Sequence, residues 1–276
     1  MSSAHASPNA SLPVAPLPGR GARWALLLDV DGTLLDFSDD PASVAAPRAL
    51  TVLLHDLHAA LDGALGLISG RTIGDLDRIV GHARWPAAGL HGLELRHANG
   101  SYRRGNVSAV GRARMRMLAG ELAARFEGVQ IEDKQQALAL HCRNDPGKLE
   151  ALREAAASLL PQLPDYELQP GRQVVEFRPV GVDKGEAVRQ LLAVPPFAGR
   201  VPVYVGDDLT DEHAFKQINC VHGISVRAGS RVPTLAQFSL ADPAAVRAWL
   251  QRVLNAISHG DSSHVGLPHG IPPRQP

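Results

Sequence analysis

The sequence has little cysteine and no excess of charge of either sign. Its 276 residues include only Cys142 and Cys220, too few for a disulfide framework or a cysteine-based metal cluster. Lys plus Arg and Asp plus Glu number 28 each, so the net charge favours neither nucleic acid nor an anionic membrane. We therefore expect no nucleic-acid partner, and no obligate protein partner is evident in the sequence. Two unpaired thiols suit a reducing compartment, the cytoplasm.

Long apolar runs are also missing. No stretch approaches the ~20 apolar residues of a membrane span, so we expect no membrane association. Residues 1–21 are rich in Ser, Ala and Pro and lack the basic start and apolar run of a secretory signal. This N-terminal segment and the tail 258–276, where His, Gly, Ser and Pro dominate, are both predicted to be disordered.

Short apolar runs alternate with helical patterns at both ends of the remaining chain. Buried strands are predicted at 24–28, 64–68, 201–205 and 222–226. Helices are predicted at 47–61, 72–80, 183–194, 210–218 and 243–257. This alternation is typical of a parallel sheet with helices on its faces. We therefore predict an α/β fold with a Rossmann-like parallel-sheet core domain, built from 22–105 and 182–257 and including a hairpin at 93–104 that turns at Asn99-Gly100.

The pattern changes between the two parts of this core. Over 106–181 the order helix, strand, strand occurs twice. The predicted helices are 108–126 and 146–160, and the predicted strands are 129–133, 136–143, 166–169 and 173–178. This order predicts an inserted α+β cap domain (αββαββ) with an antiparallel sheet.

An acid pair follows the first predicted strand, in Asp29-Val30-Asp31-Gly32-Thr33. Ligands of an open parallel sheet bind beyond the carboxyl ends of its strands, and residues two apart in an extended segment point to the same side. A calcium loop begins with the same letters, but it needs its glycine at the sixth position and a helix on either side. An acidic turn without chemistry is the remaining alternative. We favour a catalytic pair.

Three further segments lie at predicted strand ends or helix starts. Ser69-Gly70-Arg71 follows the second strand and offers a hydroxyl and a main-chain N–H at a helix start, which suits phosphate. Lys184 opens the helix after the inserted domain; alone, it fits an ordinary surface lysine. The run 206–212, Gly-Asp-Asp-Leu-Thr-Asp-Glu, carries four acids that repel one another unless a cation or hydrogen-bond donors compensate them.

The order of these segments resembles the haloacid dehalogenase (HAD) superfamily and, within it, the trehalose-6-phosphate phosphatase family. Ile131-Glu132-Asp133-Lys134, Leu140-His141 and Val175-Glu176-Phe177-Arg178-Pro179 resemble motifs of that family's cap. The resemblance implies a Mg²⁺-dependent phosphatase. Its expected substrate is trehalose 6-phosphate, a small-molecule sugar phosphate, which it hydrolyses to trehalose and phosphate through an aspartyl-phosphate intermediate.

The resemblance also implies a role for each residue. Asp29 is the expected nucleophile and Asp31 the general acid and base, while Ser69 and Lys184 offset charge on the phosphoryl group. The expected Mg²⁺ ligands are Asp29, Asp31 through its main-chain carbonyl, Asp207 and Asp208. Asp211 is expected to support the metal site without binding the metal directly. The sequence alone does not show whether Asp208 or Asp211 lies closer to the metal. The expected substrate-binding residues are Gly70, Arg71, Glu132, Lys134 and Glu176.

Other readings remain. Glu132, Lys134 and Glu176 are also compatible with the solvated face of an antiparallel sheet. The chain could be another sugar-phosphate phosphatase or a phosphomutase of the same superfamily, although the run from Asp208 to Glu212 fits the phosphatase better. It could also be a non-catalytic sugar-phosphate-binding module. Such a module would be expected to have lost Asp29 or Asp31, and both are present.

Overall fold

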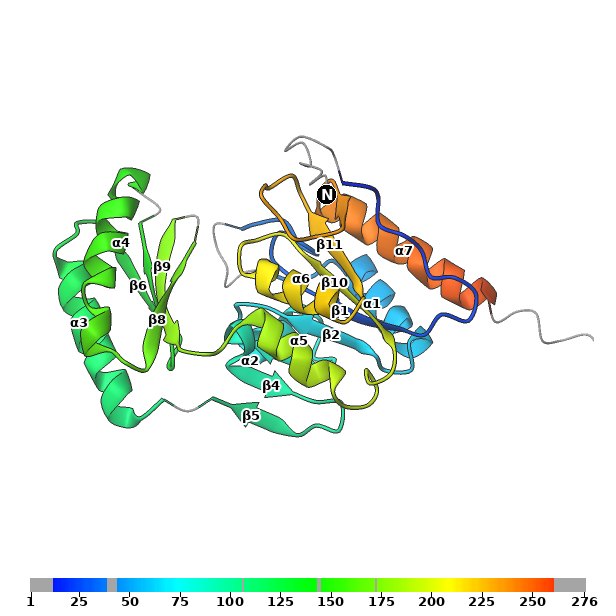
Figure 1. Ribbon diagram of the computed structural model, residues 1–276, viewed down its shortest axis with the longest axis horizontal. Helices are drawn as coiled ribbons and strands as arrows, with labels where there is room; N and C mark the ends of the chain where they lie inside the picture. Colours follow the sequence, from blue (N-terminus) through cyan, green and yellow to red (C-terminus); the bar gives the residue numbers. More distant parts are fainter. Residues whose placement is uncertain (1–11, 39–43, 106, 143–144, 172, 261–276) are drawn as a thin grey trace, which may run out of the picture.

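The computed structural model describes residues 12–38, 44–105, 107–142, 145–171 and 173–260. These residues form a mixed α/β fold with two sheets, one of eight strands and one of four (Figure 1). The strand order of the larger sheet is β12-β11-β10-β1-β2-β3-β4-β5. Its first six strands pair in parallel, and β4 and β5 are added antiparallel at one edge. The predicted fold class is confirmed.

The strands of the larger sheet are short and apolar. All five residues of β1 are buried, as a parallel strand covered by helices on both faces requires. The bounds are β1 Trp24–Leu28, β2 Leu65–Ile68, β3 Ala87–Gly89, β4 Glu94–Arg96, β5 Tyr102–Arg104, β10 Val201–Gly206, β11 Ile224–Ala228 and β12 Phe238–Leu240. The central β1 lies between β2 and β10, so the loops after these strands meet at one edge of the sheet.

Within the described residues, five helices belong to this sheet: α1 Arg48–Ala60, α2 Ile73–Ile79, α5 Lys184–Leu192, α6 Asp211–Cys220 and α7 Pro243–Gly260. Helix α1 buries Leu50, Leu53, Leu54 and Leu57, one stripe at helical spacing. It packs against α7, and α5 packs against α6 (Figure 1). The connection from β1 through α1 to β2 and the connection from β10 through α6 to β11 run in opposite directions across the sheet. Because such crossovers are right-handed, α1 and α6 lie on opposite faces of the sheet.

The smaller sheet lies in the segment between β5 and α5. Its order is β6-β7-β9-β8 and all its pairs are antiparallel. The bounds are β6 Gln130–Asp133, β7 Leu138–His141, β8 Tyr166–Pro170 and β9 Val174–Pro179, with helices α3 Ala109–Ala124 and α4 Leu149–Ala157. Its buried side chains form a hydrophobic cluster of their own around Leu140, Leu152 and Phe177. Figure 1 shows this unit to one side of the larger sheet, joined to it by two chain crossings.

Residues 12–21 correct the prediction of a disordered N-terminal segment. Ser239 N donates to Pro13 O at 2.9 Å, Trp249 Nε1 donates to Pro16 O at 2.9 Å, and Ala15 is buried. Main-chain carbonyls therefore attach this Pro-rich segment to β12 and α7. Residues 1–11 lie outside the described residues, as does the tail from 261, while α7 continues past the expected end at 257.

Two other elements differ from expectation. The hairpin between β4 and β5 turns over residues 97–101, where His97 N donates to Ser101 O and only Gly100 has a left-handed φ of 80°. Asn99 contributes through its side chain, which accepts from Ser101 N at 2.9 Å. The helix expected at 146–160 consists of a short 3₁₀ turn at Pro146–Lys148, α4, and a second 3₁₀ turn at Leu160–Gln162.

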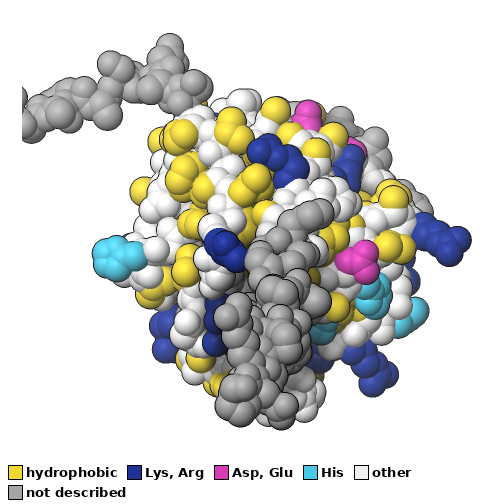
Figure 2. Space-filling model, turned by 90° about the vertical axis from the view of Figure 1, so that its right-hand side faces the viewer, with side chains coloured by type: hydrophobic (Ala, Val, Ile, Leu, Met, Phe, Trp, Pro, Cys, Tyr) yellow, Lys and Arg dark blue, Asp and Glu magenta, His cyan; other side chains and the backbone are white. Residues whose placement is uncertain are grey.

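The surface on the α7 side is mixed in character. On the face shown in Figure 2, Lys and Arg side chains are scattered between hydrophobic ones and do not gather over one element. None of the described helices combines the length and apolar character needed to cross a bilayer.

Candidate active site

The loop after β1 brings the first acid pair to the edge of the sheet. Asp29 is 4% exposed, and the main-chain N–H groups of Leu34 and Leu35 donate to Val30 O at 2.8 and 3.0 Å, so the chain folds back at once. Gly32 has a φ of +76°, and a Cβ there would lie 2.3 Å from Asp207 Oδ2. A glycine at this position therefore lets the loop contact the acidic run that follows β10.

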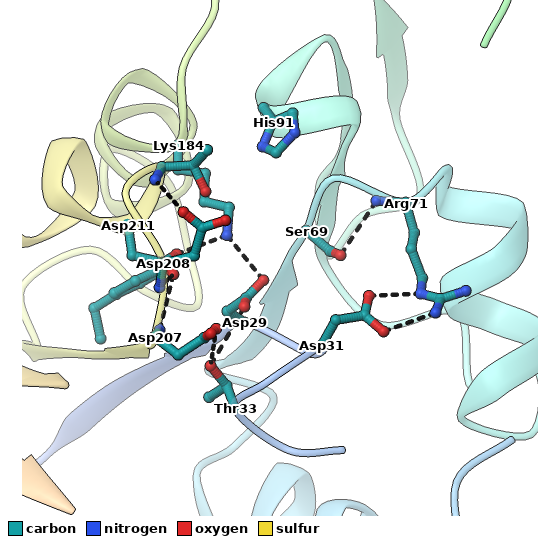
Figure 3. A network of polar contacts seen from close by, with 12 residues as sticks. Asp29, Asp31, Thr33, Ser69, Arg71, His91, Lys184, Asp207, Asp208 and Asp211 are labelled. Atoms are coloured by element: carbon teal, nitrogen blue, oxygen red, sulfur yellow. Dashed lines mark hydrogen bonds and ion pairs between the residues drawn. The ribbon is translucent and has the colours of Figure 1, made fainter. Parts of the chain in front are cut away.

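Lys184 links Asp29 to the acidic run. It is the first residue of α5, whose N-terminus is capped by Asp183 Oδ1 accepting from Glu186 N at 2.8 Å. Its Nζ donates to Asp29 Oδ1 at 2.9 Å and to Asp211 Oδ1 at 2.6 Å (Figure 3). Burial alone lowers the pKa of Lys184, but the charges of Asp211 and Asp29 raise it above its ordinary value. The lysine is therefore held as a buried cation.

Asp211 has a donor on both of its carboxylate oxygens. Oδ1 accepts from Lys184 and from Tyr204 Oη at 2.6 Å, and Oδ2 accepts from the main-chain N–H groups of Asp207 and Asp208 at 2.9 Å each. The residue is 0% exposed. Because four donors converge on it, Asp211 fixes both the lysine and the backbone that carries the next two acids.

Asp29, Asp207 and Asp211 form a group that fits a metal ion. One carboxylate oxygen from each lies within 4.8 Å of the others. Burial raises the pKa of Asp29 well above its ordinary value, with Lys184 opposing and Asp211 adding to the rise. Burial and then Asp211 raise the pKa of Asp207 to about 7. The single positive charge of Lys184 does not neutralise the negative charge of three ionised carboxylates. A divalent cation therefore suits this set of oxygen donors.

The structure separates Asp208 and Asp211, which the sequence left unranked. Asp211, and not Asp208, lies in the three-carboxylate group. Asp208 Oδ1 accepts from Thr210 N at 3.0 Å, a local turn at the start of α6, and Asp208 lines the same cavity as Asp29. Thr33 joins the group from the other side, since its hydroxyl oxygen lies 3.1 Å from Asp207 Oδ1 and 3.3 Å from Asp29 Oδ2 and its one proton can be donated to either carboxylate.

The carboxylate of Asp31 points away from this group. It accepts from Arg71 Nε at 2.6 Å and Nη2 at 2.7 Å, a two-point ion pair (Figure 3). Ser69 is 1% exposed, and its Oγ accepts from Arg71 N at 3.2 Å. The Asp31 carboxylate is therefore engaged by Arg71 and is not part of the three-carboxylate group.

A cavity of about 630 Å³ opens between the two sheets. From the larger sheet and its loops it is lined by Asp29, Asp31, Ser69, Gly70, Arg71, His91, Lys184 and Asp208. From the smaller sheet it is lined by Ile131, Glu132, Lys134 and His141. The predicted transfer residues and two of the predicted cap residues therefore face one space.

The smaller sheet presents its polar groups on one face. Glu132, Ala139 and Glu176 are in register across β6, β7 and β9, so β7 lies between the strands that carry the two glutamates. Lys134 Nζ donates to Glu176 Oε2 at 3.1 Å, and His141 Nε2 lies 2.8 Å from Glu132 Oε2. Glu176 is buried at the margin of the cavity, between the lining residues Lys134 and His91, and its Oε2 lies 3.1 Å from Lys134 Nζ and 4.0 Å from His91 Nε2.

Four polar residues of this region were missed in the sequence: Thr33, His91, His141 and Tyr204. Thr33 and His141 lie inside segments already singled out, so their position was the available signal. Tyr204 lies within an apolar strand, where a tyrosine is normally a core residue. His91 follows β3 in a short 3₁₀ turn, Leu90–Gly92, and no nearby acid pair or glycine-rich loop marks it.

Comparison with known proteins gives one consistent family. The family model described as trehalose-phosphatase matches residues 27–244. The probable trehalose-phosphate phosphatase of Sinorhizobium fredii is 43% identical over 216 residues, 76% of this chain and 79% of that protein. The trehalose-6-phosphate phosphatase of Escherichia coli is 36% identical over 245 residues, 89% of this chain and 92% of that protein.

The fold is also found among solved structures. The C-terminal domain of C. albicans trehalose-6-phosphate phosphatase superposes with a TM-score of 0.74 at 24% identity, covering 87% of this chain and 99% of that one. At this identity the superposition shows a shared fold. It covers most of this chain, so the likeness is not limited to the larger sheet.

Proposed function

The chain belongs to the trehalose-phosphatase family, and from this premise we propose that it hydrolyses trehalose 6-phosphate to trehalose and phosphate. The observation that carries the proposal is the position of Asp29. Its buried carboxylate, hydrogen-bonded to Lys184, faces a cavity that is also lined by Glu132 and Lys134 of the smaller sheet. The side chains of these two residues can form hydrogen bonds with sugar hydroxyls. A phosphate bound at Asp29 therefore leaves its sugar against the smaller sheet.

Asp29 is the proposed nucleophile. One of its oxygens forms a bond to phosphorus while the bond from phosphorus to the sugar oxygen breaks, which gives an aspartyl-phosphate and replaces one difficult step by two easier ones. Lys184 holds the carboxylate in position through the 2.9 Å contact, and its charge opposes the rise in the pKa of Asp29 that burial causes. With Ser69, it also offsets charge on the transferring phosphoryl group.

Asp31 is the proposed acid and base. It protonates the sugar oxygen as that oxygen leaves, then takes a proton from the water that hydrolyses the aspartyl-phosphate. In the structure both of its oxygens accept from Arg71, so Asp31 exchanges at least one of these contacts for the ester oxygen during turnover. Arg71 lines the same cavity, so its guanidinium is placed to contact the phosphate when the exchange occurs.

The metal group fits Mg²⁺, because its donors are carboxylate oxygens and their charge exceeds that of Lys184. We propose that Asp29, Asp207 and the Asp31 carbonyl hold the ion, with Asp208 as a further candidate and Asp211 as support. The four hydrogen bonds of Asp211 leave it the least available of the three carboxylates. A bound Mg²⁺ withdraws charge from the phosphoryl oxygens.

One assay tests the proposed function. Free phosphate is measured over time from trehalose 6-phosphate and a panel of other sugar phosphates, with and without Mg²⁺. We expect rapid, Mg²⁺-dependent release with trehalose 6-phosphate preferred. Preference for another sugar phosphate would give the chain a different substrate, phosphoryl transfer to a second sugar hydroxyl without phosphate release would make it a mutase, and binding without turnover would make it a sensor.

A further inference from the structure

The side chain of His91 lines the cavity from the larger sheet, and the function proposed above gives it no role. Its main-chain N–H donates to Ser69 O at 2.9 Å, which places it beside the predicted phosphate-binding loop (Figure 3). Both Leu90 and His91 have left-handed φ angles, 49° and 57°. Residues other than glycine adopt this conformation at an energetic cost, and such positions cluster at ligand-binding sites.

The ring nitrogens of His91 make no hydrogen bond to the described residues. Nδ1 is buried without a partner, and Nε2 lies 4.0 Å from Glu176 Oε2, beyond hydrogen-bond distance. Glu176 is in a similar state, since its Oε1 is also buried without a partner in the described part of the chain. The two atoms that face each other are His91 Nε2, which makes no hydrogen bond to the described residues, and Glu176 Oε2, which accepts from Lys134 Nζ at 3.1 Å and has a second lone pair. Buried polar groups are nearly always fully paired, so this facing pair indicates a place for a ligand group.

The charges around His91 indicate what kind of group that is. Burial, then the charges of Lys184, Lys134, Arg178 and His213, keep the pKa of His91 well below its ordinary value. The ring is therefore neutral, with one nitrogen that donates and one that accepts. Phosphate already has Lys184 and Ser69 beside Asp29. A neutral imidazole next to a carboxylate suits a hydroxyl, which accepts from one and donates to the other.

The distance between the two groups fits one hydroxyl. An oxygen about 2.8 Å from each of two atoms that are 4.0 Å apart has reasonable hydrogen-bond geometry to both. We propose that His91 Nε2 and Glu176 Oε2 share one hydroxyl of the leaving sugar, which makes His91 a specificity-determining residue supplied by the larger sheet. The proposal rests on the function proposed above. It also means that the sugar itself joins the two sheets.

Gly70 gains a physical explanation from the same contact. A Cβ on Gly70 would lie 2.8 Å from Cε1 and Nε2 of the His91 ring. The absence of a side chain at Gly70 therefore leaves room for the His91 ring. The ring atoms concerned include Nε2, the one proposed to bind the shared hydroxyl.

The first test compares His91→Asn with His82→Asn. Both histidines have left-handed backbones, with φ angles of 57° and 62°, and asparagine tolerates that conformation; His82 is exposed and does not line the cavity. The readout is kcat/KM on trehalose 6-phosphate divided by kcat/KM on p-nitrophenyl phosphate. We expect His91→Asn to lower this ratio about tenfold and His82→Asn to leave it unchanged. An unchanged ratio in a folded His91→Asn variant would overturn the proposal.

The second test asks whether the two residues hold the same hydroxyl. Glu176→Gln and the double variant His91→Asn/Glu176→Gln are assayed in the same way. If one hydroxyl is shared, the double variant loses about as much as the more damaging single variant, because the second change removes an interaction already lost. If the double variant instead lost the product of the two single-variant losses, the two residues would act independently and would not share a hydroxyl. If the wild type shows no preference for trehalose 6-phosphate, the proposed function fails; if it does and His91→Asn keeps that preference, only the role of His91 fails.

Discussion

The two sheets hold their polar groups in different ways. Around Asp29, the key side chains are buried and bonded: Lys184 has two carboxylate partners and Asp211 has four donors. On the smaller sheet, Glu132 is 52% exposed on the edge strand β6, and Glu176 keeps an oxygen without a partner among the described residues. One region is assembled before substrate arrives, and the other is completed by it.

This difference follows from the chemistry each region performs. A phosphoryl group carries charge that fixed donors stabilise best when they need no rearrangement. Sugar hydroxyls are neutral and numerous, and groups with unused hydrogen-bonding capacity can select them. Changes near Asp29 should therefore slow the hydrolysis of every phosphate ester, whereas changes on the smaller sheet should slow that of the sugar ester alone.

The largest expected effect is that of Asp29→Asn. The amide is not a competent nucleophile, so we expect kcat to fall by at least about 10⁴-fold on both trehalose 6-phosphate and p-nitrophenyl phosphate. The fold should survive, because the buried carboxylate is itself destabilised by its surroundings. Asp36→Asn, an exposed acid in the same loop, is the matched control. Appreciable turnover by a verified Asp29→Asn sample would contradict the assignment.

Removal of the metal should have the second-largest effect on turnover. Because three carboxylates meet with one lysine, we expect chelation to lower turnover roughly 10³-fold on both substrates and Mg²⁺ to restore it. Binding should also raise Tm by a few degrees, a readout independent of activity, and Asp207→Asn should reduce that shift. Ca²⁺ should support turnover poorly, since its coordination is larger and looser. Undiminished turnover after thorough chelation would exclude the metal site.

Substitutions on the smaller sheet should separate the two substrates. We expect Glu132→Ala and Lys134→Ala to lower kcat/KM on trehalose 6-phosphate about tenfold to a hundredfold, because each removes a hydrogen bond to a charged group. The loss on p-nitrophenyl phosphate, which lacks the hydroxyls, should be much smaller. Asp133→Ala is the control on the same strand, since Asp133 pairs with Arg116 and does not line the cavity. Equal losses on both substrates would remove the distinction between the two regions.

The smallest expected effect is on the pH dependence of stability. In metal-free protein the pKa of Asp207 is about 7, against an ordinary value of 3.8, so its contribution to stability is complete below about pH 4 and is lost as pH rises through 7. Over this interval Tm should fall by a few degrees more in the wild type than in Asp207→Asn. Mg²⁺ should suppress the difference. Parallel pH profiles of the two proteins would show that Asp207 is not destabilised by its neighbours.

The sequence was most informative where the reactive side chains directly follow a strand of the parallel sheet. The acids after β1 and β10 follow short apolar runs, and parallel strands bring such ends together, so the grouping of Asp29, Asp207 and Lys184 could be expected. The strand β12, Phe238–Leu240, has three residues and no periodic pattern, and it was missed. Residues 12–21 were missed because their attachment uses the carbonyls of Pro13 and Pro16, which composition does not reveal.

The order of strands and the finer contacts of the site could not be read from local patterns. Nothing near Glu132 or Glu176 indicates that β7 lies between their strands. The choice between Asp208 and Asp211 depends on which carboxylate turns inward to Lys184 and Tyr204, a tertiary contact. His91 depends on the approach of β9 to the turn after β3, which joins residues far apart in the chain.

The central claim is that Asp29 carries the phosphoryl group during hydrolysis of the sugar ester. The most direct measurement is rapid acid quenching of wild-type protein during turnover of trehalose 6-phosphate with Mg²⁺, followed by borohydride reduction and peptide mass spectrometry. Reduction converts an aspartyl-phosphate to homoserine. We predict homoserine at position 29 and at none of Asp31, Asp207, Asp208 or Asp211. Homoserine at another aspartate, with Asp29 unmodified in actively turning-over protein, would contradict the account.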